Sequence, residues 1–96
     1  MLNTQEINTL NNYFKTQPVF KAFVFGSYAR NENDNESDLD LIVELDYSKP
    51  IGLKFIKMKL ELEKLMHKKV DLVSENSVSK YIKPFIEKEK MLIYAK

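Results

Sequence analysis

The stretch from Leu39 to Leu45 constrains the fold more than any other part of the chain. It reads Leu-Asp-Leu-Ile-Val-Glu-Leu, and a short, nearly continuous apolar run is typical of a buried strand. Asp40 lies inside this run, and Asp38 stands two positions before it. Because alternate side chains of a strand point to the same face, the two aspartates should share one face and the intervening apolar residues the other. The run therefore predicts a sheet with an apolar face and a pair of carboxylates opposite it.

The other elements are expected to surround this strand. Asn3 and Glu6 have the spacing of a capping box, which marks the start of the first helix. The expected elements are a helix over 4–15, a strand over 19–25, a helix over 53–67, a strand over 70–73, a helix over 79–89 interrupted at Pro84, and a segment over 91–94 that is either a strand or packs against the body. This order predicts a small α/β (α+β) domain with a mixed β-sheet and helices packed on it in two or three layers.

The helix over 53–67 carries two apolar stripes. The first has the spacing of a core face and consists of Phe55, Met58, Leu62, Leu65 and Met66. The second lies nearly opposite and consists of Leu53, Ile56 and Leu60. We expect the C-terminal segment to cover the second stripe; the alternative is an exposed patch that docks a partner.

Length and composition narrow the classes of protein. The 96 residues have room for one domain, so we expect residues 1–96 to form a single domain. No cysteine is present, which excludes disulfides and thiolate metal sites. No apolar run is long enough for a transmembrane helix, and the polar N-terminus does not resemble a signal peptide. A cytoplasmic protein without membrane contact is the simplest interpretation.

The net charge of +1 hides an uneven distribution. Residues 1–48 carry 3 basic and 8 acidic side chains, whereas residues 49–96 carry 12 and 6. Seven of the 14 acidic residues lie between Glu32 and Asp46, where their mutual repulsion favours a bound cation. A solvated acidic loop is the alternative, but it explains Asp38 and Asp40 poorly. The lysines of the second half alternate with acids, so they indicate a solvated surface rather than a nucleic-acid site.

Gly26 and Ser27 follow the strand over 19–25 directly. Glycine lets the backbone approach a ligand closely, and a short helix starting here would offer N–H groups to a phosphate. Arg30 could face the same side and add a bidentate phosphate contact. The alternative is a plain turn between two elements.

The aspartates suit a divalent cation. Paired carboxylates are typical ligands of Mg²⁺, which usually takes one or two of them together with phosphates and water. Asp71 lies within the short apolar strand over 70–73, where an unpaired charge is costly to bury. If that strand lies beside the one over 39–45, Asp71 completes a three-carboxylate cluster with Asp38 and Asp40 that could hold two metal ions. Positions at a sheet edge facing water are the alternative.

Taken together, these motifs resemble a known family. Gly26-Ser27-Tyr28-Ala29-Arg30, followed after a gap by Ser37-Asp38-Leu39-Asp40-Leu41-Ile42-Val43, resembles the pattern of the polymerase-β-like nucleotidyltransferases, in particular the minimal nucleotidyltransferases that act as antitoxins. The resemblance covers nearly the whole chain, because the stretches 70–72 and 81–86 are similar too. Asn31 stands where a glycine is common in the family, which weakens the case for the turn but touches no catalytic atom.

The resemblance implies a fold of the minimal nucleotidyltransferase kind and a specific chemistry. Gly26, Ser27 and the adjacent backbone would hold the triphosphate, and Asp38 and Asp40 would bind two Mg²⁺ ions. Asp71 would bind the catalytic metal and help to activate a hydroxyl. The reaction implied is transfer of a nucleoside monophosphate, AMP from ATP, with release of pyrophosphate.

The resemblance also implies a partner. Larger relatives carry a second domain that grips the acceptor, whereas minimal nucleotidyltransferases resemble antitoxins that add AMP to a hydroxyl, commonly of a tyrosine, on a HEPN-type ribonuclease toxin. Two alternatives stay open: an antitoxin that neutralises its partner by binding alone, and a small-molecule nucleotidyltransferase. Tyr28 is expected to pack or to form a lid contact rather than to act as a catalyst. His67 is expected to cap a helix rather than to bind a ligand.

Overall fold

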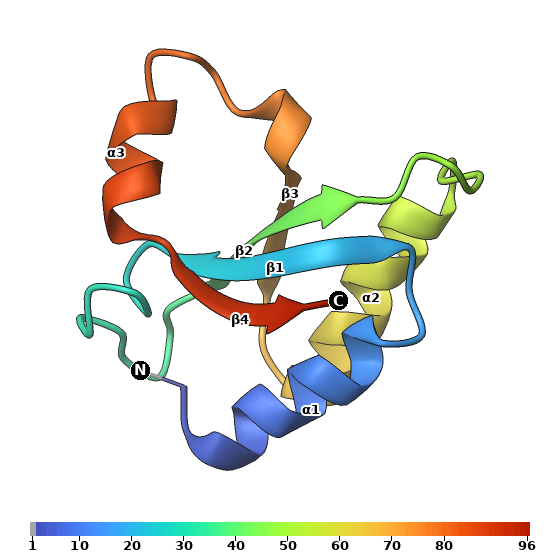
Figure 1. The fold of residues 1–96 in the computed structure, drawn as a ribbon. Coiled ribbons are helices and arrows are strands. Elements are labelled where there is room, and N and C mark those ends of the chain that lie inside the picture. Colours follow the sequence, from blue (N-terminus) through green and yellow to red (C-terminus); the bar gives the residue numbers. More distant parts are fainter. Residues whose placement is uncertain (1) are drawn as a thin grey trace.

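A four-stranded mixed sheet forms the centre of the structure, a computed structural model that describes residues 2–96 (Figure 1). The strands are β1 (Val19–Phe25), β2 (Leu39–Leu45), β3 (Val70–Ser74) and β4 (Met91–Ala95), in the order β3-β2-β1-β4. Strand β1 pairs antiparallel with β2 and β4, whereas β2 pairs parallel with β3. The mixed sheet predicted from the order of the elements is confirmed, and β1 and β2 are its two inner strands.

The helices are α1 (Thr4–Phe14), α2 (Lys54–Met66) and α3 (Lys83–Glu89), with a 3₁₀ turn, η1 (Glu75–Ser77), after β3. The predicted capping box begins α1: Asn3 Oδ1 accepts from the Glu6 amide at 2.8 Å, and Glu6 Oε1 accepts from the Asn3 amide at 3.1 Å. His67 ends α2 with a left-handed φ of 55°, as expected of a C-terminal cap. None of these helices in residues 2–96 is long and apolar enough to cross a membrane.

The core lies between the sheet and the helix pair α1 and α2, which Figure 1 shows together on one side, away from α3. Its largest fully buried side chains come from both helices and from the strands: Leu10, Phe14, Val19, Leu39, Leu41, Val43, Met58, Leu62 and Val70. The alternation predicted for β2 is confirmed, because every second residue from its first position is buried in this core. Asp40 is therefore left on the opposite face.

Two expectations about helices are wrong. No helix begins at Gly26; residues 26–31 form a run of turns instead. Pro84 does not interrupt the C-terminal helix but lies in its first turn, where the missing amide hydrogen costs nothing. Residues 80–82 ahead of it form turns, so the helix starts at residue 83, four residues later than predicted.

The expected cover of the second stripe of α2 is also wrong. Leu53, Ile56 and Leu60 are 81%, 57% and 57% exposed. The C-terminal segment pairs with β1 as strand β4 and so does not reach this face of α2. The first stripe is core as predicted at Met58, Leu62 and Met66, whereas Leu65 is exposed in large part.

Candidate active site

The structure brings Asp71 beside Asp40. Strands β2 and β3 are adjacent and parallel, and their register pairs Asp40 with Asp71. Directly paired residues of neighbouring strands project to the same face, which here is the face away from α1 and α2. Asp38 lies two positions before Asp40 and is exposed. The three aspartates singled out in the sequence therefore gather at one end of β2 and β3.

Asp40 has a pKa that its surroundings shift. Its carboxyl is half-buried, and this burial raises its pKa, with further increases from the charge of Asp71 and then of Asp38. The Arg30 guanidinium acts in the opposite direction but does not cancel the effect. Negative charge is therefore concentrated where it is costly, and a cation bound at this place would relieve that cost.

Gly26 lies against the carboxylate of Asp40. The register of β1 and β2 pairs Phe25 with Asp40, so the turn after β1 begins beside this aspartate. Gly26 has a left-handed φ of +71°, and a Cβ atom added to it would stand 2.2 Å from Asp40 Oδ2. Only glycine therefore allows the turn and the carboxylate to lie together. This contact joins the motif that begins at Gly26 with the motif that contains Asp40, although the two are separated in the sequence.

The turn that follows is held firmly. The Arg30 amide donates to Gly26 O at 3.1 Å, and the Glu32 amide donates to Ser27 O at 2.8 Å. Tyr28 is buried, and its hydroxyl accepts a hydrogen bond from Lys68 Nζ, so its expected packing role is confirmed. The Ser27 hydroxyl makes no hydrogen bond to any residue in 2–96 and remains available to a ligand.

A fourth carboxylate reaches the site, and the sequence motifs did not indicate it. Glu89, at the end of α3, accepts from the Gly26 amide at 3.2 Å and from Arg30 Nη1 at 3.2 and 3.3 Å. Arg30 also pairs with Glu32 at 3.1 Å, and these two carboxylates, Glu32 first, raise the pKa of its guanidinium. Glu89 is 63 positions from Gly26 and has no motif around it, so only the tertiary structure identifies it.

The carboxylates of the three aspartates fit Mg²⁺ as a pair of ligands rather than as a complete shell. Across residues 2–96, no three acidic or histidine side chains lie close enough together to hold a metal ion by themselves. Mg²⁺ does not need such a set, because it usually takes one or two carboxylates and completes its shell with phosphates and water. Asp40 with Asp38 or Asp71 provides such a pair, and the charge repulsion at Asp40 supports this assignment.

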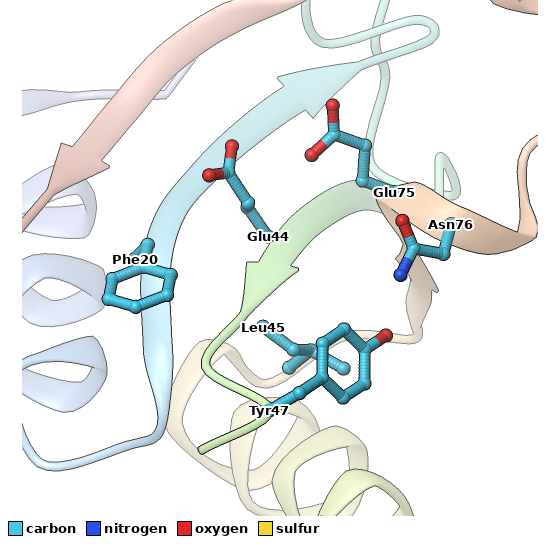
Figure 2. Close-up of a pocket in the computed structure, with 6 residues that line it drawn as sticks. All are labelled: Phe20, Glu44, Leu45, Tyr47, Glu75 and Asn76. Carbon is cyan, nitrogen blue, oxygen red and sulfur yellow. The ribbon is translucent and has the colours of Figure 1, made fainter. Parts of the chain in front are cut away.

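A pocket of about 350 Å³ lies at the C-terminal end of β2, away from the aspartates. It is lined by Phe20, Glu44, Leu45, Tyr47, Glu75 and Asn76, and Figure 2 shows the carboxylates of Glu44 and Glu75 over the end of the sheet. None of the aspartates or of the turn residues contributes to it. The candidate active site, with Asp40 and Asp71, therefore lies at the opposite end of the strand.

A mixed sheet with aspartates on two adjacent strands, facing a glycine-serine turn, has the arrangement of a nucleotidyltransferase. Residues 8–96 match the family model described as "Polymerase beta, Nucleotidyltransferase". The chain is also 34% identical over 94 residues to the protein adenylyltransferase MntA of Thermococcus cleftensis, covering 93% of this chain and 94% of that relative. The chain belongs to the polymerase β nucleotidyltransferase family, and the family resemblance found in the sequence is confirmed.

Solved structures share the fold. A chain from a toxin-antitoxin complex with AMP-PNP has a TM-score of 0.79 at 17% identity, over 94% of this chain and 73% of that one. A chain from a tri-AMPylated Shewanella oneidensis HEPN toxin in complex with its MNT antitoxin has a TM-score of 0.72 at 15% identity, over 99% and 74%. At these identities the likeness shows the fold alone, and it confirms the small mixed sheet with packed helices.

Proposed function

We propose that this chain is an Mg²⁺-dependent protein adenylyltransferase that transfers AMP from ATP to a hydroxyl of a HEPN-type toxin and thereby acts as its antitoxin in the cytoplasm. In this proposal residues 1–96 form a single minimal nucleotidyltransferase domain. The observation that carries it is the convergence of Asp40, Asp71 and Gly26, which three separate stretches of the chain contribute to one end of the sheet.

In this proposal the turn residues and the aspartates have different roles. The backbone at Gly26, the Ser27 hydroxyl and Arg30 bind the phosphates of ATP and orient its α-phosphorus. Asp40 would hold Mg²⁺ together with Asp38 or with Asp71 as its second carboxylate, and the ion would neutralise charge on the phosphates. Rate enhancement in such a site comes mostly from positioning and charge neutralisation.

The transfer itself is a single displacement at phosphorus. The acceptor hydroxyl oxygen forms a bond to the α-phosphorus, the bond between that phosphorus and the bridging oxygen breaks, and pyrophosphate leaves. Asp71 is exposed next to Asp40 and is placed to accept the hydroxyl proton. An exposed base suits an acceptor on the surface of another protein.

One relative and two solved structures of the same fold support the partner and the substrate. The relative of T. cleftensis is named a protein adenylyltransferase, and one structure of the same fold comes from a complex that contains an AMPylated HEPN toxin. Another comes from a toxin-antitoxin complex with AMP-PNP, an analogue of ATP. These are properties of those proteins, and they make a HEPN toxin and ATP the first partner and substrate to test.

The experiment is a transfer assay with a HEPN-type toxin as the acceptor. ATP labelled at its α-phosphorus should label the toxin in the presence of Mg²⁺, whereas ATP labelled at its γ-phosphorus should not. Asp40→Asn and Asp71→Asn should each lower the rate by about 100-fold or more, because each removes charge stabilisation in the transition state. Label from the γ-phosphorus would indicate a kinase and refute the proposal.

A matched control separates chemistry from general damage. Glu44 lies on β2 four residues after Asp40 and is half-buried like it, but at the other end of the strand. Glu44→Gln removes the same charge and should keep close to the full rate. Equal losses in Glu44→Gln and Asp40→Asn would show that the aspartate has no special role.

Neutralisation by binding alone is the second candidate, and the uncovered stripe of α2 favours it. Leu53, Ile56 and Leu60 present an apolar face of this helix to solvent. The double variant Asp38→Ala/Asp40→Ala distinguishes the two candidates in cells that express the toxin. Growth arrest with this variant supports adenylylation, whereas continued protection supports binding alone.

A further inference from the structure

The carboxylate of Glu89 occupies the donors that the proposed function assigns to phosphate. The Gly26 amide and the Arg30 guanidinium both donate to it, at 3.2 Å each to Oε1. Carboxylate and phosphate oxygens compete for the same donors, because both are anionic acceptors that pair with arginine and with backbone N–H groups. A triphosphate cannot use these two donors while Glu89 holds them.

The segment that carries Glu89 is held loosely. Helix α3 has seven residues and contributes no buried side chain to the core. Tyr81 and Phe85 on this segment are 77% and 72% exposed. Moving the helix away would therefore sacrifice little apolar burial, in contrast to moving α1 or α2.

The negative charge of Glu89 also repels a bound nucleotide. Its carboxylate adds to the negative potential that raises the pKa of Asp40. A triphosphate would bring several more negative charges to the same place, so its binding and the present position of Glu89 are mutually unfavourable. Strand β4 follows directly after α3 and pairs with β1, which limits the movement to the helix.

From this geometry, and resting on the proposed function, we propose that Glu89 is an internal competitor for the phosphate site, which closes the site in the free protein and which ATP must displace. Binding of the triphosphate then releases α3 from the site. The free chain is in this way protected from unproductive nucleotide binding. The same contact makes the C-terminal segment responsive to nucleotide.

The test is the dissociation constant of Mg²⁺-ATP, measured by titration calorimetry on the full chain. Glu89→Gln keeps the shape of the side chain but removes its charge, and we expect binding about two- to fivefold tighter than in the wild type, as for the loss of a partly exposed ion pair. Glu87→Gln is the matched control, because Glu87 lies on the same helix but pairs with Lys90 at 3.0 Å. This control should bind like the wild type.

The nature of the ligand gives a second readout. Inorganic triphosphate should show the same gain as ATP in Glu89→Gln, whereas adenosine should show none, because the contact concerns phosphate alone. Unchanged or weaker ATP binding in Glu89→Gln overturns this proposal and leaves the proposed function intact. Failure of the wild-type chain to bind Mg²⁺-ATP at all overturns both.

Discussion

Replacing Gly26 with alanine tests the contact that joins the turn to Asp40. The left-handed backbone at Gly26, with φ of +71°, costs an alanine about 1–2 kcal/mol. The new Cβ would also stand 2.2 Å from Asp40 Oδ2, well inside the 3.0 Å below which such contacts essentially never occur. Because Oδ2 is the end of a side chain, the carboxylate can rotate away, so the damage falls on its position rather than on the fold.

Gly52 provides the matched control. It too has a positive φ, of +42°, but a Cβ added there meets no atom within 4 Å. Gly52→Ala should therefore show a backbone cost of the same kind without disturbing any carboxylate. For a domain of this size we expect both variants to lose roughly 4–8 °C in Tm for each kcal/mol of cost.

The two variants should differ in catalysis. Displacement of a metal-binding carboxylate by about 1 Å costs about 100-fold in rate, so Gly26→Ala should lose adenylyl transfer to this extent while Gly52→Ala keeps it. Tm is measured by circular dichroism and transfer with ATP labelled at the α-phosphorus. If the folded fraction of Gly26→Ala transfers AMP as fast as Gly52→Ala, the contact with Asp40 does not position the carboxylate and the reasoning fails.

Three further predictions concern stability in the absence of metal. Asn3→Ala breaks the capping box with Glu6 and should lower the free energy of unfolding by about 1 kcal/mol in urea titrations; an unchanged midpoint would contradict it. Phe14→Ala empties a fully buried position and should cost about 3–5 kcal/mol in the same assay, and a loss below that of Asn3→Ala would show that the site is not packed. Because the pKa of Asp40 is higher in the folded chain than the unfolded value of about 3.9, the folded state keeps its proton to higher pH. The protonated Asp40 therefore stabilises the fold fully below the unfolded pKa, and this stabilisation is lost as the pH rises through the folded pKa. Between these pH values the free energy of unfolding should decrease less in Asp40→Asn than in the wild type. Identical pH profiles of the two proteins would refute this.

Local rules predicted most of the secondary structure. The bounds of β1 and β2 agree with the sequence-based expectation, because each is a short apolar run with clear breaks at both ends. The helix predicted over 4–15 is one residue longer than α1 at its end, and the helix predicted over 53–67 is one residue longer than α2 at each end. Differences of this size are the usual spread of helix ends. The least accurate bounds were those of α3, because a proline such as Pro84 is compatible both with the interruption of a helix and with the first turn of one.

The site was predictable only in part. Asp38 and Asp40 share a face because of strand periodicity, which is a property of adjacent residues. Glu89 was not predictable, because a glutamate near the end of an amphipathic segment has the same sequence pattern whether it faces solvent or contacts Gly26 and Arg30. The sequence also wrongly predicted that the C-terminal segment covers the second stripe of α2. The reason is related, because the sequence does not show which sheet edge this segment pairs with.

The sequence by itself determined the family, the strand that carries Asp38 and Asp40, and the turn at Gly26, because these depend on spacing within a few residues. Only the tertiary structure decided that β3 lies parallel to β2 in a register that pairs Asp71 with Asp40, and that Glu89 reaches the turn. Strand order and register are set by burial summed over the whole sheet, and a shift of one residue would turn Asp71 to the other face. Long-range packing therefore completes the site that local patterns began.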